Sequence, residues 1–593
     1  VIILGDQNNT LGTYTFTADN QMQLGADVEA LLGITFASPT LLIADSAVKS
    51  NQGSVEFADD VSGGYELTIQ ANNGNAIISS VGASGAPTGL TVNAKDIDIG
   101  DGEVAGDVNL TATNNVNING ALASTATAGL INVAATQNIN IAQTSNASLT
   151  AIDGDITLTA ANIYLGDNAD TYAGSIETTG TGNIKLDVSG NFVMNANTGT
   201  GIVSGGWIGI DPIDVVIAGA GLSAVGDITV TADNTITVNA DIMADSDGSG
   251  AGDATLISGV SIAQATLPIP GPIISGANVT LESGTIHAGN LEATAGDVDV
   301  TATTGDLYLS SVLGIQATGD VYLESTAGSI GYLNGDILAG GDVTLFAGNG
   351  ITMHGAIGAS TPIGGNVYFI GPNVVVVDGT NYYAVGGNLY LDGTVRAEGE
   401  VYAGANGFVN VLEPMISNNS DVTLIAGTGI ITDNNGNIEA TLGDINLMTV
   451  GLVDLSTSLT AGNDVIIGAA GHIAQNAGYI SAGSNVDIAG NNIELIDVYA
   501  DGNIEVYGTG TVSISDNGLY ADGGYIEVGA VGNVTVGADI DAGDYATLVS
   551  ANGSVSQTAG TISGTYVEVS AGQNVALIDV VGNTNGPSGY AIK

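Results

Sequence analysis

The stretch Gly-Asp-Val-Thr-Leu at residues 341–345 carries the pattern that decides the fold. A glycine and an acidic residue precede a short run in which every second position is apolar. The same phrase returns as Gly-Asp-Val-Asp-Val at 296–300, Gly-Asp-Val-Tyr-Leu at 319–323 and Gly-Asn-Val-Tyr-Phe at 365–369. Apolar residues at every second position are typical of a half-buried β-strand. The sequence therefore predicts many short strands built on one repeat.

The repeat has a nearly constant length. Five successive copies begin their apolar run at Val298, Val321, Val343, Val367 and Leu389, so the gaps are 23, 22, 24 and 22 residues. Each copy holds two or three short apolar runs separated by Gly, Asn and Asp, which favour tight turns. Three strands and three turns in roughly 21 residues describe one rung of a stacked solenoid. We predict an all-β, right-handed parallel β-helix with a rod-like form.

The pattern is least regular near the amino terminus and at two internal segments. Residues 1–100 are expected to form N-terminal strands, in which 26–32, Ala-Asp-Val-Glu-Ala-Leu-Leu, is either a short helix that caps the first rung or a strand. A joint is expected at 204–222, around Trp207 and Pro212. The segments 101–238 and 276–593 are expected to be β-helix, and the second of them to be the more regular.

A second joint is expected at 239–275. This segment combines an Asp-rich stretch at 245–253 with Leu-Pro-Ile-Pro-Gly-Pro at 267–272. Proline has no N–H to donate to a strand ladder, so such a segment favours a loop.

Composition excludes several classes of function. The chain has 593 residues, 61 Asp plus Glu, 5 Lys plus Arg and no Cys, which gives a formal net charge of −56. Nucleic acid and anionic lipid are therefore not expected as partners, because both are bound through Lys and Arg. The hydrophobic content of 44% excludes a disordered polyanion. No window approaches the ~18 uninterrupted apolar residues of a membrane span.

Two runs carry a family resemblance. Ala-Gly-Gly-Asp-Val-Thr-Leu at 339–345 and Ala-Gly-Asn-Asp-Val-Ile-Ile at 461–467 resemble the repeats of filamentous-haemagglutinin-type exoproteins, which are long β-helical adhesins. The resemblance covers about residues 100–580. It implies export to the cell surface and a role in adhesion or surface structure. The Asn-Pro-Asn motifs of that family's secretion domain do not occur in this sequence.

An acidic loop and a set of tyrosines are the candidate sites. Asp245, Asp247 and Asp253, with glycines between them, offer the oxygen ligands that Ca²⁺ prefers, although a solvated acidic loop is the alternative. A second set shares the outward parity of similar strands and is expected to form an exposed aromatic ladder, either for contact with another rod or a sugar or as simple cross-strand support. That set is Tyr308, Tyr322, Tyr368 and Tyr390.

Three functions are compatible with such a rod. The favoured one is an extracellular or cell-surface structural protein that polymerises head to tail with copies of itself, because the open edge of a strand ladder can pair with another chain. The first alternative is an adhesin for surface glycans or proteins. The second is a polysaccharide-active enzyme, which we do not expect. The five cations are scattered singly, and the three histidines follow no ligand spacing.

Overall fold

A computed structural model describes most of the chain. The residues described are 1–9, 11–167, 172–195, 201–265, 271–310, 313–332, 335–353, 356–357, 367–370, 374–378, 381–385, 389–391, 395–397, 399–405, 407–582 and 591–592. The side chains of residues 352–390 are not described. The chain divides into two units, Val1–Val298 and Asp299–Lys593. In the described residues every regular element is a strand, and none forms a helix that could cross a membrane.

The predicted parallel β-helix is confirmed in each unit. One rung of the second unit runs through β55 (Val422–Ala426), β56 (Gly429–Thr432) and β57 (Ile438–Ala440). The next rung repeats this order as β58 (Ile445–Thr449), β59 (Leu452–Leu455) and β60 (Leu459–Ala461). β55 pairs in parallel with β58, β56 with β59 and β57 with β60. Three parallel ladders therefore run through the unit, and we call them the first, second and third ladder.

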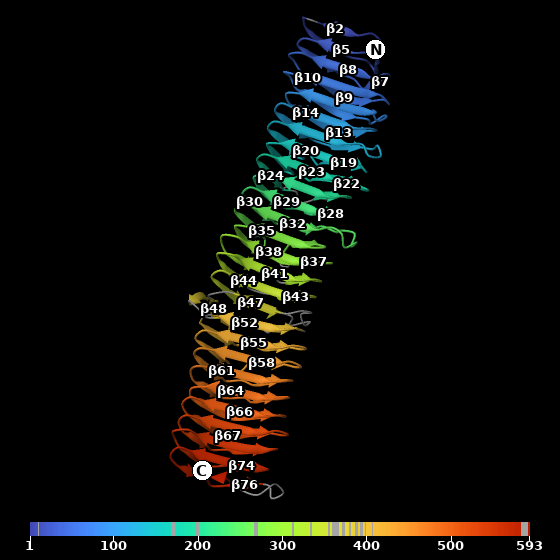
Figure 1. The fold of residues 1–593 in the computed structure, drawn as a ribbon. Coiled ribbons are helices and arrows are strands. Elements are labelled where there is room, and N and C mark those ends of the chain that lie inside the picture. Colours follow the sequence, from blue (N-terminus) through green and yellow to red (C-terminus); the bar gives the residue numbers. More distant parts are fainter. Residues whose placement is uncertain are drawn as a thin grey trace. The chain divides into compact units, whose positions relative to one another are not determined.

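The first ladder positions the sites described below, and Figure 1 shows its strands following one another in chain order within each unit. In the first unit it contains β5 (Val28–Ala30), β8 (Ser46–Ser50), β10 (Glu66–Ala71), β12 (Gly89–Ala94), β14 (Val108–Ala112), β17 (Ile131–Ala135), β20 (Ile156–Ala160), β23 (Ile184–Val188), β26 (Ile208–Asp211), β29 (Ile228–Ala232), β32 (Ala254–Ser258) and β35 (Val279–Ser283). In the second unit it contains β41 (Val321–Ser325), β44 (Val343–Ala347), β47 (Val367–Ile370), β52 (Val401–Ala405), β55, β58, β61 (Val465–Ala469), β64 (Val486–Gly490), β66 (Ile504–Gly508), β68 (Ile526–Ala530), β71 (Tyr545–Ser550) and β74 (Tyr566–Ala571).

Because side chains alternate along each strand, each ladder has rows of buried apolar side chains on its inner face. Val422 and Leu424 of β55 are fully buried, and they pair with the equally buried Ile445 and Leu447 of β58. In the first unit the second ladder stacks three phenylalanines, Phe16 of β3 (Thr13–Phe16), Phe36 of β6 (Gly33–Phe36) and Phe57 of β9 (Val55–Ser62). The ring centroids of Phe36 and Phe57 lie 4.4 Å apart with nearly parallel planes. Aromatic stacking adds to the burial of apolar area.

Within residues 26–32 the chain forms the short strand β5 and not a helical cap. Val28 and Ala30 of β5 are buried, whereas Glu29 between them points outward and makes an ion pair of 3.0 Å with Lys49. An alternating pattern buries one face of a strand, and it would spread these residues around a helix.

The two predicted joints lie inside the first unit, and the first ladder continues through both. Across 204–222, β26 pairs with β23 before it and β29 after it, because Pro212 lies just beyond the end of β26 and removes no ladder bond. Across 239–275, β32 pairs with β29 and β35. Extra residues leave that rung in a loop at 244–253 and in a connection after β33 (Ser261–Gln264), of which 266–270 lie outside the described residues.

One rung of the second unit is much longer than predicted. Val367 of β47 pairs with Val401 of β52, so the chain takes 34 residues to return to the first ladder. Leu389 is not part of that ladder. The additional length includes an antiparallel hairpin of β48 (Val374–Asp378) and β49 (Asn381–Val385). Leu389 instead begins β50 (Leu389–Leu391), which belongs to the second ladder and pairs with β53 (Phe408–Val411).

Candidate functional site

The Asp or Asn residue of the repeated phrase binds the next rung. Between residues 421 and 525 of the second unit each such side chain accepts a hydrogen bond at Oδ1 from the backbone N–H of its successor, at 2.8–3.1 Å. The acceptors, which we call the Asp/Asn ladder, are Asp421, Asp444, Asp464, Asn485 and Asn503. As Asp and Asn between apolar runs, these residues are predicted only to form turns. Their regular spacing in the sequence could have revealed a ladder. When every rung pairs in the same register, residues at the same position of the repeat stack on one another.

The three candidate calcium ligands make separate contacts. Asp245 is 6% exposed, and its Oδ1 accepts hydrogen bonds from Ser249 Oγ at 3.0 Å and from the Gly250 N–H at 2.8 Å. Asp247 accepts from the Ser249 N–H, also at 3.0 Å. Asp253 accepts from the N–H and the Nδ2 of Asn278, and so extends the same kind of rung-to-rung bond in the first unit. Within the described ranges no group of three or more His, Asp or Glu side chains could hold a metal ion.

The hydrogen bonds also decide the protonation of Asp245. Burial alone raises the pKa of this carboxyl, but the hydrogen bonds from Ser249, Gly250, Ala251 and Thr294 outweigh it and leave the pKa lowered. The carboxylate therefore acts as the hydrogen-bond acceptor that closes its loop. Calcium binding here stays a prediction.

The four candidate tyrosines divide between two ladders. Tyr322 and Tyr368 both pair with Thr344 in the first ladder, whereas Tyr308 and Tyr390 lie on β39 (Leu307–Leu309) and β50 in the second. Tyr308 and Tyr322 are exposed by 39% and 36%, as their outward parity predicted. The side chains of Tyr368 and Tyr390 lie outside the described residues. The longer rung after β47 is the reason that the similar strands of Tyr368 and Tyr390 do not share a ladder.

A different set of tyrosines forms a column that the sequence analysis missed. Tyr525, Tyr545 and Tyr566 occupy successive rungs at one register of the first ladder, and the rings of Tyr525 and Tyr545 stack with centroids 4.7 Å apart. Each of these tyrosines stands directly before an apolar alternation, at the position that Asp or Asn holds in the earlier rungs. This replacement of Asp or Asn by Tyr, always one residue before the apolar run, is the sequence pattern from which the tyrosine column could have been predicted.

The tyrosine hydroxyls bind an adjacent row of carboxylates. Tyr507 donates to Glu527 Oε2 at 2.9 Å, Tyr545 donates to Glu527 Oε1 at 3.2 Å, and Tyr525 donates to Glu505. The hydrogen bond to Glu505, with partial burial and the surrounding negative charge, raises the pKa of Tyr525 to about 12. These hydroxyls therefore remain protonated donors to the carboxylates.

We call this row the acidic column. Asp487, Glu505 and Glu527 are consecutive partners on β64, β66 and β68, and Glu568 of β74 follows after one threonine. Partial desolvation, and then the charge of Glu505, raise the pKa of Asp487, whose side chain remains exposed. No Lys or Arg occurs between residues 422 and 571, so this face of the second unit is strongly negative.

A second outward column lies two residues further along the strands, and it shares β64, β66 and β68 with the acidic column. Its members are paired from rung to rung on β55, β58, β61, β64, β66, β68 and β71. We call this the apolar column, and it consists of Ile425, Met448, Gly468, Ala489, Tyr507, Gly529 and Val549. Two residues along a strand span about 6.6 Å, so the apolar and acidic columns are immediate neighbours on one face.

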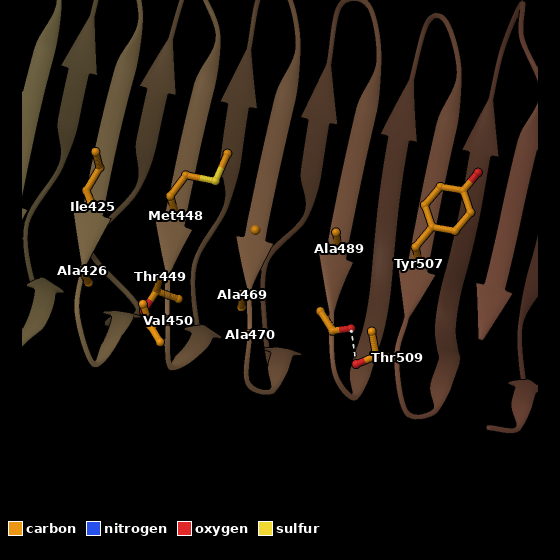
Figure 2. Close-up of a pocket in the computed structure, with 12 residues that line it drawn as sticks. Ile425, Ala426, Met448, Thr449, Val450, Ala469, Ala470, Ala489, Tyr507 and Thr509 are labelled. Atoms are coloured by element: carbon orange, nitrogen blue, oxygen red, sulfur yellow. Dashed lines mark hydrogen bonds between the residues drawn. The ribbon is translucent and has the colours of Figure 1, made fainter. Parts of the chain in front are cut away.

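Small residues hollow the apolar column at two places. Gly468 and Ala489 form the floor of a first hollow of about 750 Å³, and Figure 2 shows Met448 and Tyr507 rising on either side of Ala489. Gly529 lies in a second hollow of about 440 Å³ between Tyr507 and Val549. The large side chains remain partly in solvent, with Ile425, Tyr507 and Val549 exposed by 42%, 44% and 37%. The result is an open apolar groove.

No family model, curated protein or solved structure matches this chain. The resemblance of its repeats to those of filamentous-haemagglutinin-type exoproteins therefore stays a prediction. What the structure defines is the class of fold, a parallel β-solenoid, with an acidic surface and an apolar groove on its second unit.

Proposed function

We propose that the chain is an extracellular or cell-surface structural protein that assembles end to end with copies of itself, and that it is not an enzyme. The observation that carries this proposal is that two sets of hydrogen bonds, one from the backbone and one from side chains, join neighbouring rungs. Besides the backbone ladders, the Asp/Asn ladder ties consecutive rungs of the second unit together from Asp421 to Tyr525, at about 20-residue intervals. Repeated nearest-neighbour interfaces of this kind stabilise a solenoid along its whole length. A scaffold benefits from such uniform bonding.

The surface chemistry supports the same proposal. Trypsin-like proteases cleave after Lys or Arg, of which the chain has 5 in 593 residues. The two apolar hollows described above are open, and their linings contain no histidine. The unpaired N–H and C=O groups at one end of a parallel ladder can form hydrogen bonds with those at the opposite end of another copy. A second copy can therefore continue the ladder.

Assembly is expected to depend on salt. With a net charge of −56, copies repel one another when the Debye length is about 30 Å at 0.01 M ionic strength, and much less when it is about 8 Å at 0.15 M. Sedimentation velocity should therefore show monomers at low salt and a growing assembled fraction at physiological salt.

Sodium chloride and calcium chloride at matched ionic strength provide the control. Equal assembly in both salts would indicate screening, whereas assembly in calcium alone that Asp245→Asn removes would indicate a specific ion site. Monomers in every condition, up to high protein concentration, would reject self-assembly.

Adhesion is the second candidate function, and the apolar groove favours it because exposed apolar patches often mark interaction sites. Monomers that fail to assemble but coat surfaces bearing glycans or proteins would support adhesion over a structural role.

A further inference from the structure

We propose that the apolar groove of the second unit binds a basic amphipathic α-helix of a partner protein. The inference concerns a different surface from that of end-to-end assembly and does not depend on it. Its basis is the combination of a hollowed apolar column with an acidic column at its side.

The length of the groove suits a helix. The apolar column from Ile425 to Val549 covers seven strands, and six spacings of about 4.8 Å make roughly 29 Å. An α-helix rises 1.5 Å per residue, so about 19 residues would cover this length. A helix lying across the strands would remain in contact with the column throughout.

The spacing of the hollows suits one face of a helix. The first hollow is centred between Gly468 and Ala489 and the second at Gly529, which are two and a half strand spacings, or about 12 Å, apart. Residues i and i+7 or i+8 of a helix share a face and lie about 10.5–12 Å apart. Two large apolar side chains at that spacing would enter the two hollows.

Charge selects the partner. On β64, β66 and β68, Asp487, Glu505 and Glu527 lie along one side of the groove. The other side carries neutral residues such as Val450, Ala470 and Val531. A helix with Lys or Arg on one flank and apolar residues on its buried face would satisfy both sides. A second copy of this chain is a poor occupant, because its own acidic face would meet these carboxylates.

Aliphatic lining favours a helix over a sugar chain. Ile425, Met448, Val450 and Val549 contribute most of the large side chains, and Tyr507 is the single aromatic residue in the two hollows. Aliphatic walls match leucine-like side chains, as in other helix-in-groove complexes.

The test uses the full chain and a fluorescein-labelled 21-residue peptide of Leu and Lys, patterned as an amphipathic helix. Fluorescence anisotropy at 0.15 M salt should show saturable one-to-one binding. Ala489→Leu fills the first hollow and should weaken binding at least tenfold. Ala134→Leu is the matched control, because Ala134 is also the fourth residue of a five-residue strand of the first ladder, in the other unit. It should leave the affinity unchanged.

Charge is tested separately. The double variant Glu505→Gln and Glu527→Gln should weaken binding at least fivefold and flatten its salt dependence, whereas Glu282→Gln on β35 should not. A Leu and Glu peptide of the same pattern should not bind. Equal affinity for wild type and Ala489→Leu would overturn the proposal. So would a glucosamine oligomer that binds in place of the peptide and is lost in Ala489→Leu, since the groove would then be a polysaccharide site.

Discussion

Phe36→Ala is expected to lower the free energy of unfolding of the intact chain's first unit by about 3–5 kcal/mol, the usual cost of truncating a fully buried phenylalanine. Phe36 is 0% exposed and lies in the middle of an aromatic stack, with ring centroids 5.1 Å from Phe16 and 4.4 Å from Phe57. Its loss would leave a cavity lined by two rings that the neighbouring rungs hold in place.

Denaturant unfolding and site-resolved hydrogen exchange of β3, β6 and β9 would measure the effect. Tyr65→Ala is the control, since Tyr65 is an aromatic residue of the same unit that is 41% exposed. If both variants unfold at the same denaturant concentration, the phenylalanine stack does not stabilise this unit.

Gly53→Ala is expected to cost at least about 3 kcal/mol, at the upper end of the overpacking range. Gly53 lies in the turn between β8 and β9, and an added Cβ would stand 1.3 Å from the carbonyl oxygen of Leu32 and 2.2 Å from its carbonyl carbon. Both atoms belong to the backbone of the preceding rung, so the rungs must separate to admit the methyl group.

Gly64→Ala provides the matched control. Gly64 also lies in a turn of the first unit, between β9 and β10, but a Cβ there would have no neighbour within 4 Å. Its substitution should change stability by less than about 0.5 kcal/mol. Thermal unfolding of the two variants, measured in parallel, would test this difference in stability. A Gly53→Ala protein as stable as Gly64→Ala would mean that the rungs are not packed as closely as described.

The solenoid itself could be predicted because its signal is local and repeated. Val343, Thr344 and Leu345 alternate in and out, and the same offset recurs in other rungs, so the strand, its buried face and the parallel stacking follow together. The approximate rung length follows from the same repeat. Period-2 patterning and turn residues suffice when every rung obeys them.

Side-chain neighbours could not be predicted so well, because they depend on the exact number of residues in each rung. The long rung between β47 and β52, which contains a hairpin, places Leu389 and Tyr390 in the second ladder. Tyr308 also lies in the second ladder, because β39 is the second strand of its own rung, and the expected ladder of four tyrosines is therefore divided. The groove was missed for a related reason. Gly468 and Ala489 are unremarkable small residues until the register aligns them between Met448 and Tyr507.

Fibre diffraction from aligned assemblies of the intact chain would test whether the parallel β-solenoids associate end to end. Strands that stack along the assembly would place the reflection near 4.8 Å on the meridian, parallel to the fibre axis. We expect this meridional reflection at physiological salt. The same reflection on the equator would mean that the solenoids associate side by side with their axes across the fibre, and this result would contradict the proposed assembly.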